Sequence, residues 1–266
     1  MPSNLPVIEP HKPGFQSLRN IGALMLREMG STYGKSPGGY LWALIEPMGT
    51  VLLLSVLFSF IIKTPSLGIS FILFYATGYL PFNLYSNISG KLLKSLQYSK
   101  PLLAYPRVVW IEAMIARTVL NCLTGITVFI FLISGILIVQ ETQTELTMAP
   151  LVIGLTGTIC IATSVGCMNC LIRSLFPIWD RIWAIIHRPI FLASCIFYIY
   201  EDLPETAQTL LWWNPLAHTS GMIREGFFPT YHPEYVSLPF VFGTSLCVLA
   251  FALIMLRRHY PSALAR

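Results

Sequence analysis

A stretch of seven residues, which precedes the first long apolar run, comes closest to a known chemical motif. The motif resembles a phosphate-binding P-loop and reads Gly30-Ser31-Thr32-Tyr33-Gly34-Lys35-Ser36. It places three residues between its glycines, whereas a Walker A sequence has four, and no predicted strand precedes it. Phosphate binding of this kind needs a strand, a loop and a helix. The sequence therefore predicts that this chain binds neither ATP nor any other cofactor.

Catalytic and metal-binding constellations are not apparent either. Cys167 and Cys170 have CxxC spacing, but no second pair or histidine cluster accompanies them, and small residues are typical where membrane helices pack together. His187, His218 and His259 are scattered along the chain. We therefore predict no metal site and no active site on this chain, which is not an enzyme by itself.

Three ionisable residues lie inside apolar runs, where charge is costly and indicates function by default. Glu112 and Arg117 are expected to pair with each other or with a neighbouring helix. Arg188 follows Arg181 by seven residues, about 10 Å along a helix. Its side chain either faces a pathway and attracts phosphate or carboxylate on a passing polymer, or extends to the membrane surface.

The elements that hold these residues are predicted to be membrane helices. Of the 266 residues, 55% are hydrophobic and 11% are charged, against about a quarter charged in soluble domains. Since about 20 apolar residues cross a bilayer, the sequence predicts an all-α integral membrane protein with six transmembrane helices. They are expected at residues 41–62, 69–88, 108–139, 150–172, 182–200 and 236–256.

The distribution of basic residues predicts the orientation. With the N-terminus inside, thirteen of the seventeen Lys and Arg residues fall on the cytoplasmic side, and only Lys63 and Arg224 fall outside. Both termini are therefore expected in the cytoplasm. We interpret the net charge of +5 as a determinant of topology rather than as a nucleic-acid-binding surface.

Two segments outside the spans have features of their own. Residues 1–36 are expected to form a cytoplasmic N-terminus whose amphipathic helix lies in the membrane interface, and residues 37–266 the six-helix transmembrane domain. Residues 1–13 contain four prolines and no apolar core, so the sequence predicts no cleavable signal peptide. Between spans five and six, residues 201–235 hold two short apolar stretches that predict two re-entrant or periplasmic helices.

Two stretches of sequence are similar to permease subunits of type 2 ABC exporters of the capsular polysaccharide branch. The first contains Tyr33-Gly34, Gly39-Tyr40-Leu41-Trp42 and Glu46-Pro47. The second contains Trp213-Asn214-Pro215-Leu216, His218, Arg224, Gly226-Phe227-Phe228 and Tyr231. The order of apolar runs extends the resemblance over essentially the whole chain.

The resemblance implies a homodimer in the bacterial inner membrane, bound to two separate ABC ATPase subunits that carry ATP and Mg²⁺. This complex would move lipid-linked capsular polysaccharide from cytoplasm to periplasm, where residues 201–235 would offer a docking site for an adaptor. A coupling helix is expected at residues 96–107, with ATPase contacts at Lys100, Pro101, Leu102, Tyr105, Pro106 and Arg107.

Aromatic residues suit sugar rings, although Trp and Tyr also gather at membrane interfaces for unrelated reasons. Together with the resemblance they suggest a translocation path lined by Tyr75, Tyr79, Arg188, Trp212, Trp213, Asn214, Arg224 and Phe227. The alternatives are export of O-antigen or a teichoic-acid-type polymer, a membrane-embedded transferase, and a self-contained channel. A transferase would need catalytic residues clustered at one depth, and a channel would need no ATPase.

Overall fold

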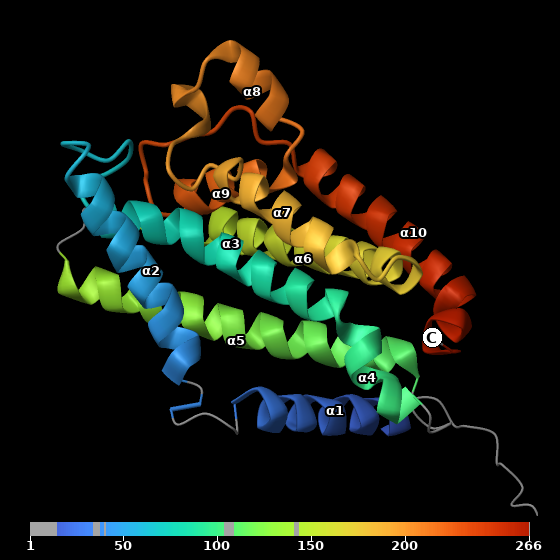
Figure 1. The fold of residues 1–266 in the computed structure, drawn as a ribbon. Helices are drawn as coiled ribbons and strands as arrows, with labels where there is room; N and C mark the ends of the chain where they lie inside the picture. The colour runs from blue at the N-terminus through green and yellow to red at the C-terminus, as the bar shows by residue number, and fades with distance from the viewer. Residues whose placement is uncertain (1–14, 34–37, 40, 104–108, 141–143, 266) are drawn as a thin grey trace, which may run out of the picture.

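A computed structural model describes residues 15–33, 38–39, 41–103, 109–140 and 144–265. Within these ranges the chain is helical and forms no strand (Figure 1). The helices are α1 (Phe15–Tyr33), α2 (Leu41–Ser59), α3 (Phe71–Leu93), α4 (Ser95–Leu103), α5 (Trp110–Val139), α6 (Met148–Leu175), α7 (Trp179–Leu192), the 3₁₀ turn η1 (Tyr200–Asp202), α8 (Glu205–Leu211), α9 (Pro215–Glu225) and α10 (Leu238–Ala265).

Four of the described helices are long and apolar enough to cross a membrane: α2, α5, α6 and the part of α10 up to His259. They occupy the predicted spans one, three, four and six. Helix α3 has 23 residues, enough to cross, but polar residues interrupt it. Helix α7 has only 14 residues. The all-helical membrane fold is confirmed, whereas the count of six spans remains a prediction.

The second half of the predicted fifth span is not helical. Helix α7 ends at Leu192, and the chain then turns, with Cys195 in a left-handed conformation at φ 54°. Two carbonyls of this turn, those of Ile196 and Tyr198, accept hydrogen bonds from the Arg224 guanidinium instead of continuing a helix. Hydropathy extends through the turn because its side chains are apolar, so the sequence pattern missed this end.

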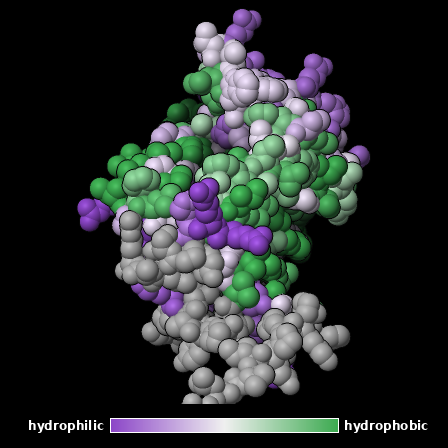
Figure 2. All heavy atoms as spheres, turned by 90° about the vertical axis from the view of Figure 1, so that its right-hand side faces the viewer, coloured by the Kyte–Doolittle hydropathy of each residue, from purple (hydrophilic) through white to green (hydrophobic). Residues whose placement is uncertain are grey.

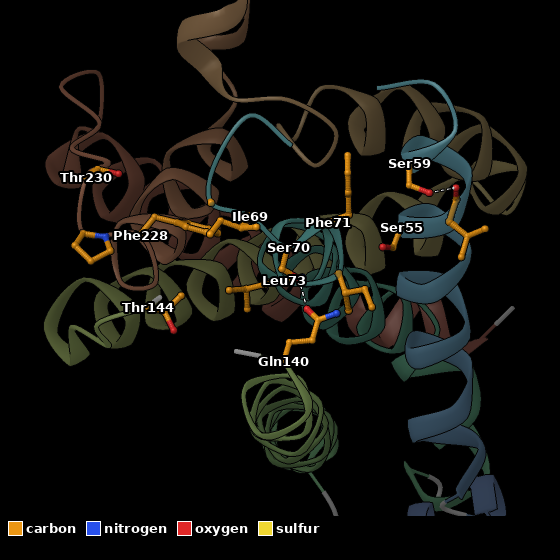
Figure 3. Close-up of a pocket in the computed structure, with 14 residues that line it drawn as sticks. Ser55, Ser59, Ile69, Ser70, Phe71, Leu73, Gln140, Thr144, Phe228 and Thr230 are labelled. Atoms are coloured by element: carbon orange, nitrogen blue, oxygen red, sulfur yellow. Dashed lines mark hydrogen bonds between the residues drawn. The ribbon is translucent and has the colours of Figure 1, made fainter. Parts of the chain in front are cut away.

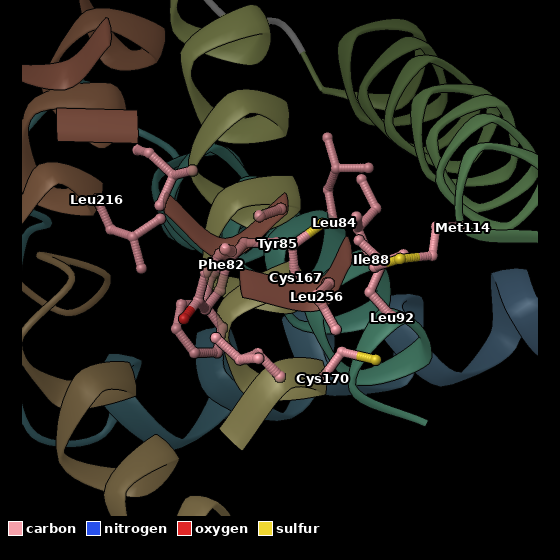
Figure 4. Packing of buried hydrophobic residues seen from close by; sticks show 14 of the residues in the cluster. Phe82, Leu84, Tyr85, Ile88, Leu92, Met114, Cys167, Cys170, Leu216 and Leu256 are labelled. Carbon is pink, nitrogen blue, oxygen red and sulfur yellow. The ribbon is translucent and has the colours of Figure 1, made fainter. Parts of the chain in front are cut away.

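Helices α3 and α6 form the centre of the molecule. Gly166 of α6 lies so close to α3 that an added Cβ would be 2.7 Å from the Cβ of Leu92. Small residues recur at every fourth position of α6 and are all buried, which forms a stripe for close helix packing: Gly154, Thr158, Ala162, Gly166 and Cys170. Around it, Leu84, Ile88 and Leu92 of α3 pack with residues of α5 and α10 (Figure 4).

Two short helices, α8 and α9, lie in the described segment between α7 and α10, and their surroundings differ. Their re-entrant or periplasmic position stays a prediction. Helix α9 is almost entirely buried, whereas α8 has no buried residue and lies at the edge of the molecule (Figure 1). Asn214 begins α9, because its side chain accepts from the Leu216 amide at 3.1 Å and donates to the Ala193 carbonyl at 2.8 Å.

The face of the molecule that carries α10 has broad apolar areas on either side of a hydrophilic cluster near its centre, and further hydrophilic side chains gather at its upper edge, at the level of α8 (Figure 2). Three large side chains of α10, Leu246, Phe251 and Ile254, are at least half exposed. Exposed apolar side chains on a membrane-capable helix suit contact with lipid.

Candidate translocation site

One face of α3 carries a row of polar side chains. Tyr79, Asn83, Asn87 and Lys91 recur at every fourth position, which places them on the same side of the helix. The Asn83 amide donates to the Tyr79 hydroxyl at 3.3 Å, and the Asn87 amide donates to the Asn83 side-chain oxygen at 2.8 Å. We call these four residues the polar ladder. It extends about 18 Å along the helix axis.

The lower part of the polar ladder lines a cavity of about 210 Å³ between α2, α3 and α5. Helix α2 contributes Trp42 and Glu46, and α5 contributes Asn121 and Thr124. The cavity therefore combines amide, hydroxyl, carboxylate, ammonium and indole groups within helices that are otherwise apolar. Such groups hydrogen-bond hydroxyls and stack on sugar rings, so this site suits a carbohydrate chain.

The opposite side of α3 is apolar and closed. Leu84, Tyr85, Ile88 and Leu92 are each at most 2% exposed and belong to the main core (Figure 4). Helix α3 thus separates a dry core from a polar face. The sequence reasoning missed Asn83, Asn87 and their cavity, although their four-residue spacing was available as a signal.

The aromatic residues predicted to line the path lie in different surroundings. Tyr79 is half-buried and joins the polar ladder. Tyr75 is 1% exposed, with its ring centroid 5.2 Å from that of Phe58 and 5.3 Å from that of Phe74. Phe227 is equally buried. Whether any of them contacts cargo stays a prediction.

The remaining residues predicted for the path are divided between surface and interior. Arg188 is exposed on α7, and Trp213 is 68% exposed. Trp212 is half-buried against Phe240, with 4.9 Å between the ring centroids. Asn214 begins α9, as described above. Arg188 is not among the residues that line the cavity of the polar ladder.

Arg224 is buried, at 1% exposure, and its guanidinium holds neighbouring segments together. Its Nη1 donates to the Tyr198 carbonyl at 2.7 Å and its Nη2 donates to the Ile196 carbonyl at 2.9 Å, while the guanidinium lies 4.3 Å from the Phe74 ring centroid. Gly78 of α3 makes this approach possible, because a Cβ there would lie 2.9 Å from Nη2. Arg224 therefore ties α9 to α3 and to the turn after α7.

His218 fixes a second junction of α9. Its Nδ1 accepts from the Ser237 amide at 3.2 Å, so the proton of the neutral ring lies on Nε2, which donates to the Trp212 carbonyl at 2.7 Å. Burial lowers the pKa of this imidazole, and the hydrogen bond to Trp212 opposes that effect. A neutral His218 thus joins the loop before α9 to the start of α10.

The predicted coupling segment contains a helix, α4, which covers its first two-thirds. Lys100 is exposed there. Pro101 and Leu102 are helical in backbone, but their side chains lie outside the description, and Tyr105, Pro106 and Arg107 lie outside the described residues. The expected ATPase contacts of these residues stay predictions.

Arg117 joins four helices on the side of the molecule that carries α4. These are α1, α3, α4 and its own helix, α5. Arg117 pairs with Glu28 of α1 at 2.9 Å, and its Nη1 donates to the Lys91 carbonyl at the end of α3 at 2.8 Å. The guanidinium also lies 4.2 Å from the ring centroid of Tyr98 in α4. We call Glu28, Tyr98 and Arg117 the junction triad.

The contacts of the junction triad decide between the two pairings that the sequence left open for Glu112 and Arg117, with each other or with a neighbouring helix. Arg117 pairs with a neighbouring helix and not with Glu112. The Glu112 carboxylate instead accepts from the Asn20 amide of α1 at 3.2 Å and from the Val109 amide at 3.3 Å. Both charged residues of α5 therefore hold α1 against the first turns of that helix.

A further contact links α4 to the turn between α6 and α7. Arg173 pairs with Asp180 at 2.8 Å and hydrogen-bonds the Gln97 side chain. Helices α1 and α4 and this turn thus form one connected surface.

A polytopic helical protein with a polar face inside apolar helices and a connected helical surface at one end has the architecture of a membrane transport subunit. The chain matches the ABC-2 type transporter family over residues 19–228, and it belongs to that family. This confirms the resemblance drawn from the two sequence segments.

Several relatives are similar over nearly their whole length. The polysialic acid transport protein KpsM of Escherichia coli is 30% identical over 254 residues, covering 95% of this chain and 98% of the relative. The capsule polysaccharide export inner-membrane protein BexB of Haemophilus influenzae is 23% identical, covering 90% of each chain. CtrC of Neisseria meningitidis serogroup A, a protein of the same description, is 25% identical, covering 94% and 96%.

Proposed function

We propose that this chain is the permease subunit of an ATP-driven exporter that moves capsular polysaccharide from the cytoplasm to the periplasm across the bacterial inner membrane. The polar ladder of α3 carries this proposal. Amide and ammonium groups inside apolar helices are too costly to face lipid, so they face a watery path. The names of the relatives indicate polysaccharide as the cargo, and the hydrogen-bonding groups of the cavity suit a polysaccharide.

Six crossings with both termini in the cytoplasm fit the lengths of the helices. At 1.5 Å per residue, the 23 residues of α3 extend about 35 Å, more than the roughly 30 Å of hydrocarbon. The 14 residues of α7 extend about 21 Å. We infer that the turn after α7 completes the fifth crossing, because Arg224 satisfies two of its carbonyls and α9 covers it.

The partners follow from the exposed side of the polar ladder. Asn87 of the ladder and Glu46 of α2 are exposed in the single chain, so a second copy is needed to enclose the path. We therefore propose a homodimer whose two polar faces line one path for lipid-linked polysaccharide. Residues 201–235 would form the periplasmic end, where an adaptor can dock.

Energy would come from two ABC ATPase subunits on the surface formed by α1, α4 and the turn after α6. Closure of the ATPases on ATP would displace α4 and α1. The junction triad would transmit that displacement to α5 and, through the Lys91 carbonyl, to the lower end of the polar ladder. ATP and Mg²⁺ stay on the ATPase subunits.

Complementation tests this function. A strain lacking its own capsule permease would receive this gene together with the gene of its ATPase partner, and surface polysaccharide would be measured with a capsule-specific antibody. We expect capsule on the surface and a stable permease–ATPase complex in mild detergent. Polymer that stays inside the cell although both proteins accumulate would overturn the proposal.

A further inference from the structure

Helix α7 is held more loosely than the helices it packs against. None of its 14 residues is buried, whereas α3 and α6 each contain many buried residues. Pro189 also interrupts its backbone, because proline has no amide hydrogen to donate to the carbonyl of Ile185. Elements with few buried contacts are the ones that move in proteins. The contacts at the two ends of α7 therefore decide what can displace it and what it displaces.

The start of α7 is connected to α4 through charged side chains. Arg173, in the last turn of α6, lies with its Nη2 2.8 Å from the Asp180 carboxylate and also donates to the Gln97 side chain of α4. We call Arg173 and Asp180 the turn pair. Asp180 lies in the first turn of α7, where the helix dipole favours a carboxylate. The two side chains are 15% and 32% exposed, so water screens their attraction only in part.

One side of α7 carries an aromatic row at every fourth position: Trp179, Trp183, His187 and Phe191. The ring centroids of Trp179 and Trp183 are 6.4 Å apart, and those of Trp183 and His187 are 6.2 Å apart. Phe82 of α3 lies against the next step, with its ring centroid 5.2 Å from that of His187 and 5.0 Å from that of Phe191. Ring contacts therefore bridge the position at which Pro189 interrupts the backbone.

Beyond Phe191, ring contacts lead to the polar ladder and to α2. The Phe191 ring centroid lies 6.4 Å from that of Tyr79, the first residue of the polar ladder. It also lies 5.3 Å from that of Phe197, in the turn after α7. Phe197 in turn lies 5.4 Å from Phe58, near the end of α2, between ring centroids. A displacement of α7 therefore reaches both the polar ladder and α2.

The end of α2 that receives these contacts borders an open cavity. The cavity has a volume of about 620 Å³, with Ser55 and Ser59 of α2 on one side and Phe228 and Thr230 on the other (Figure 3). Because no described side chain fills this cavity, the end of α2 can move without overlapping packed protein. The contacts that start at the turn pair thus end on a helix that has room to move.

We propose that Arg173 and Asp180 are positioning residues for transport. They transfer a displacement of α4 to α7, and the aromatic row carries it to Tyr79 and to the end of α2. This inference rests on the proposed function, because it needs an ATPase that displaces α4. The turn pair shares α4 with the junction triad but no residue. The junction triad acts on the lower end of the polar ladder, whereas the turn pair acts on its upper end.

Hydrogen exchange in the permease–ATPase complex tests the inference. The complex is placed in nanodiscs, and backbone exchange of the turn at residues 193–199 is compared without nucleotide and after trapping with ATP and vanadate. For the unaltered protein we expect trapping to change the exchange rate of this turn several-fold. Arg173→Gln should abolish that change and lower surface polysaccharide several-fold, while ATP hydrolysis continues. A change that persists in Arg173→Gln, or that is missing in the unaltered protein, would overturn the inference.

Two further variants separate this role from a general loss of charge. Arg181→Gln is the matched control, because Arg181 lies in the same turn of α7 but is exposed and outside the turn pair. It should keep both the exchange change and export. Arg173→Asp combined with Asp180→Arg exchanges the two charges, and the Gln97 amide can donate to the introduced carboxylate. We expect this exchange to restore both readouts. A complex that assembles with the exchanged charges but restores neither readout would contradict the role of the turn pair.

Failure of the inference and failure of the proposed function give different results. If Arg173→Gln exports as well as the unaltered protein, the inference is wrong and the proposed function stands. If the unaltered protein binds no ATPase and exports no polysaccharide, the proposed function is wrong. The inference then fails with it, because no ATPase would displace α4.

Discussion

Arg117 of α5 and Glu28 of α1 form a 2.9 Å ion pair whose side chains are 4% and 9% exposed. Desolvation makes such a pair costly to build, but removal of one partner costs about 3–5 kcal/mol because the other charge stays buried. The pair therefore fixes α1 on α5 firmly. Since the same guanidinium contacts Tyr98 and the Lys91 carbonyl, the positions of α1 and α4 are linked to the polar ladder.

Substitution of Tyr98 should uncouple ATP hydrolysis from export. Tyr98→Leu removes the ring from the Arg117 guanidinium without breaking the ion pair to Glu28, a loss of about 0.5–2 kcal/mol. We expect the permease–ATPase complex to form and to hydrolyse ATP while surface polysaccharide falls several-fold. The measurement compares ATPase activity in nanodiscs with capsule export in cells.

Tyr98→Phe is the matched control for that prediction. It retains the ring over Arg117 and removes only the hydroxyl that contacts Ser31. Export close to that of the unaltered protein is expected. A Leu variant that exports as well as the Phe variant would contradict the role of the junction triad.

The asparagines of the polar ladder should be needed for export and dispensable for folding. Asn83→Leu and Asn87→Leu replace hydrogen-bonding groups on a partly exposed face with apolar ones of similar size. We expect normal amounts of protein in the membrane and a loss of surface polysaccharide of about tenfold or more, as when buried polar recognition groups are lost.

Thr127→Leu on α5 is the comparison variant, since Thr127 is exposed but lies outside the cavity. It should export normally. Reduced membrane levels of the two asparagine variants, with export per molecule unchanged, would show that the ladder only supports the fold.

Sequence predicts the fold where hydrophobicity alone decides the structure. The apolar lengths of α2, α5, α6 and α10 identify these helices, and the basic residues predict an orientation for them. The same criterion missed the end of α7 at Leu192, because the turn that follows it is as apolar as a helix and is held by Arg224, 26 and 28 residues beyond the carbonyls it binds.

The candidate site was harder to predict because its parts come from separate helices. Asn83 and Asn87 lie within an aromatic stretch from which the sequence predicted Tyr75 as a residue of the translocation path. Tyr75 packs in the interior instead. The partner of Arg117 lies 89 residues away on α1, a distance at which one sequence gives no pairing signal. Side-chain charge predicted that Arg117 needed a partner, and only packing identified it.

Gly78 should be essential for the close approach of α3 to Arg224. In Gly78→Ala, the added Cβ would lie 2.9 Å from the Arg224 Nη2 and 3.1 Å from the Ile196 Cα. Relief of this overlap requires movement of a clamped side chain or of backbone, and overpacking of this kind costs about 1–3 kcal/mol. We expect a lower thermal midpoint for the detergent-solubilised protein.

Gly90→Ala gives the reference for that measurement. Gly90 lies in the same helix, and a Cβ there meets no atom within 4 Å. Because alanine favours a helix over glycine, this variant should be as stable as the unaltered protein or slightly more so. An equal midpoint for both alanine variants would show that Arg224 can move away without cost.

Acid should destabilise the protein through His218. Burial lowers the pKa of the folded imidazole below the value of about 6.5 expected in the unfolded chain. Between these two values the unfolded state binds more protons, so stability is fully present above about pH 6.5 and is lost as the pH falls through that window. Thermal midpoints measured from pH 7.5 to 5 should fall more steeply for the unaltered protein than for His218→Gln, which cannot titrate. A pH dependence that is unchanged in His218→Gln would contradict this role of His218.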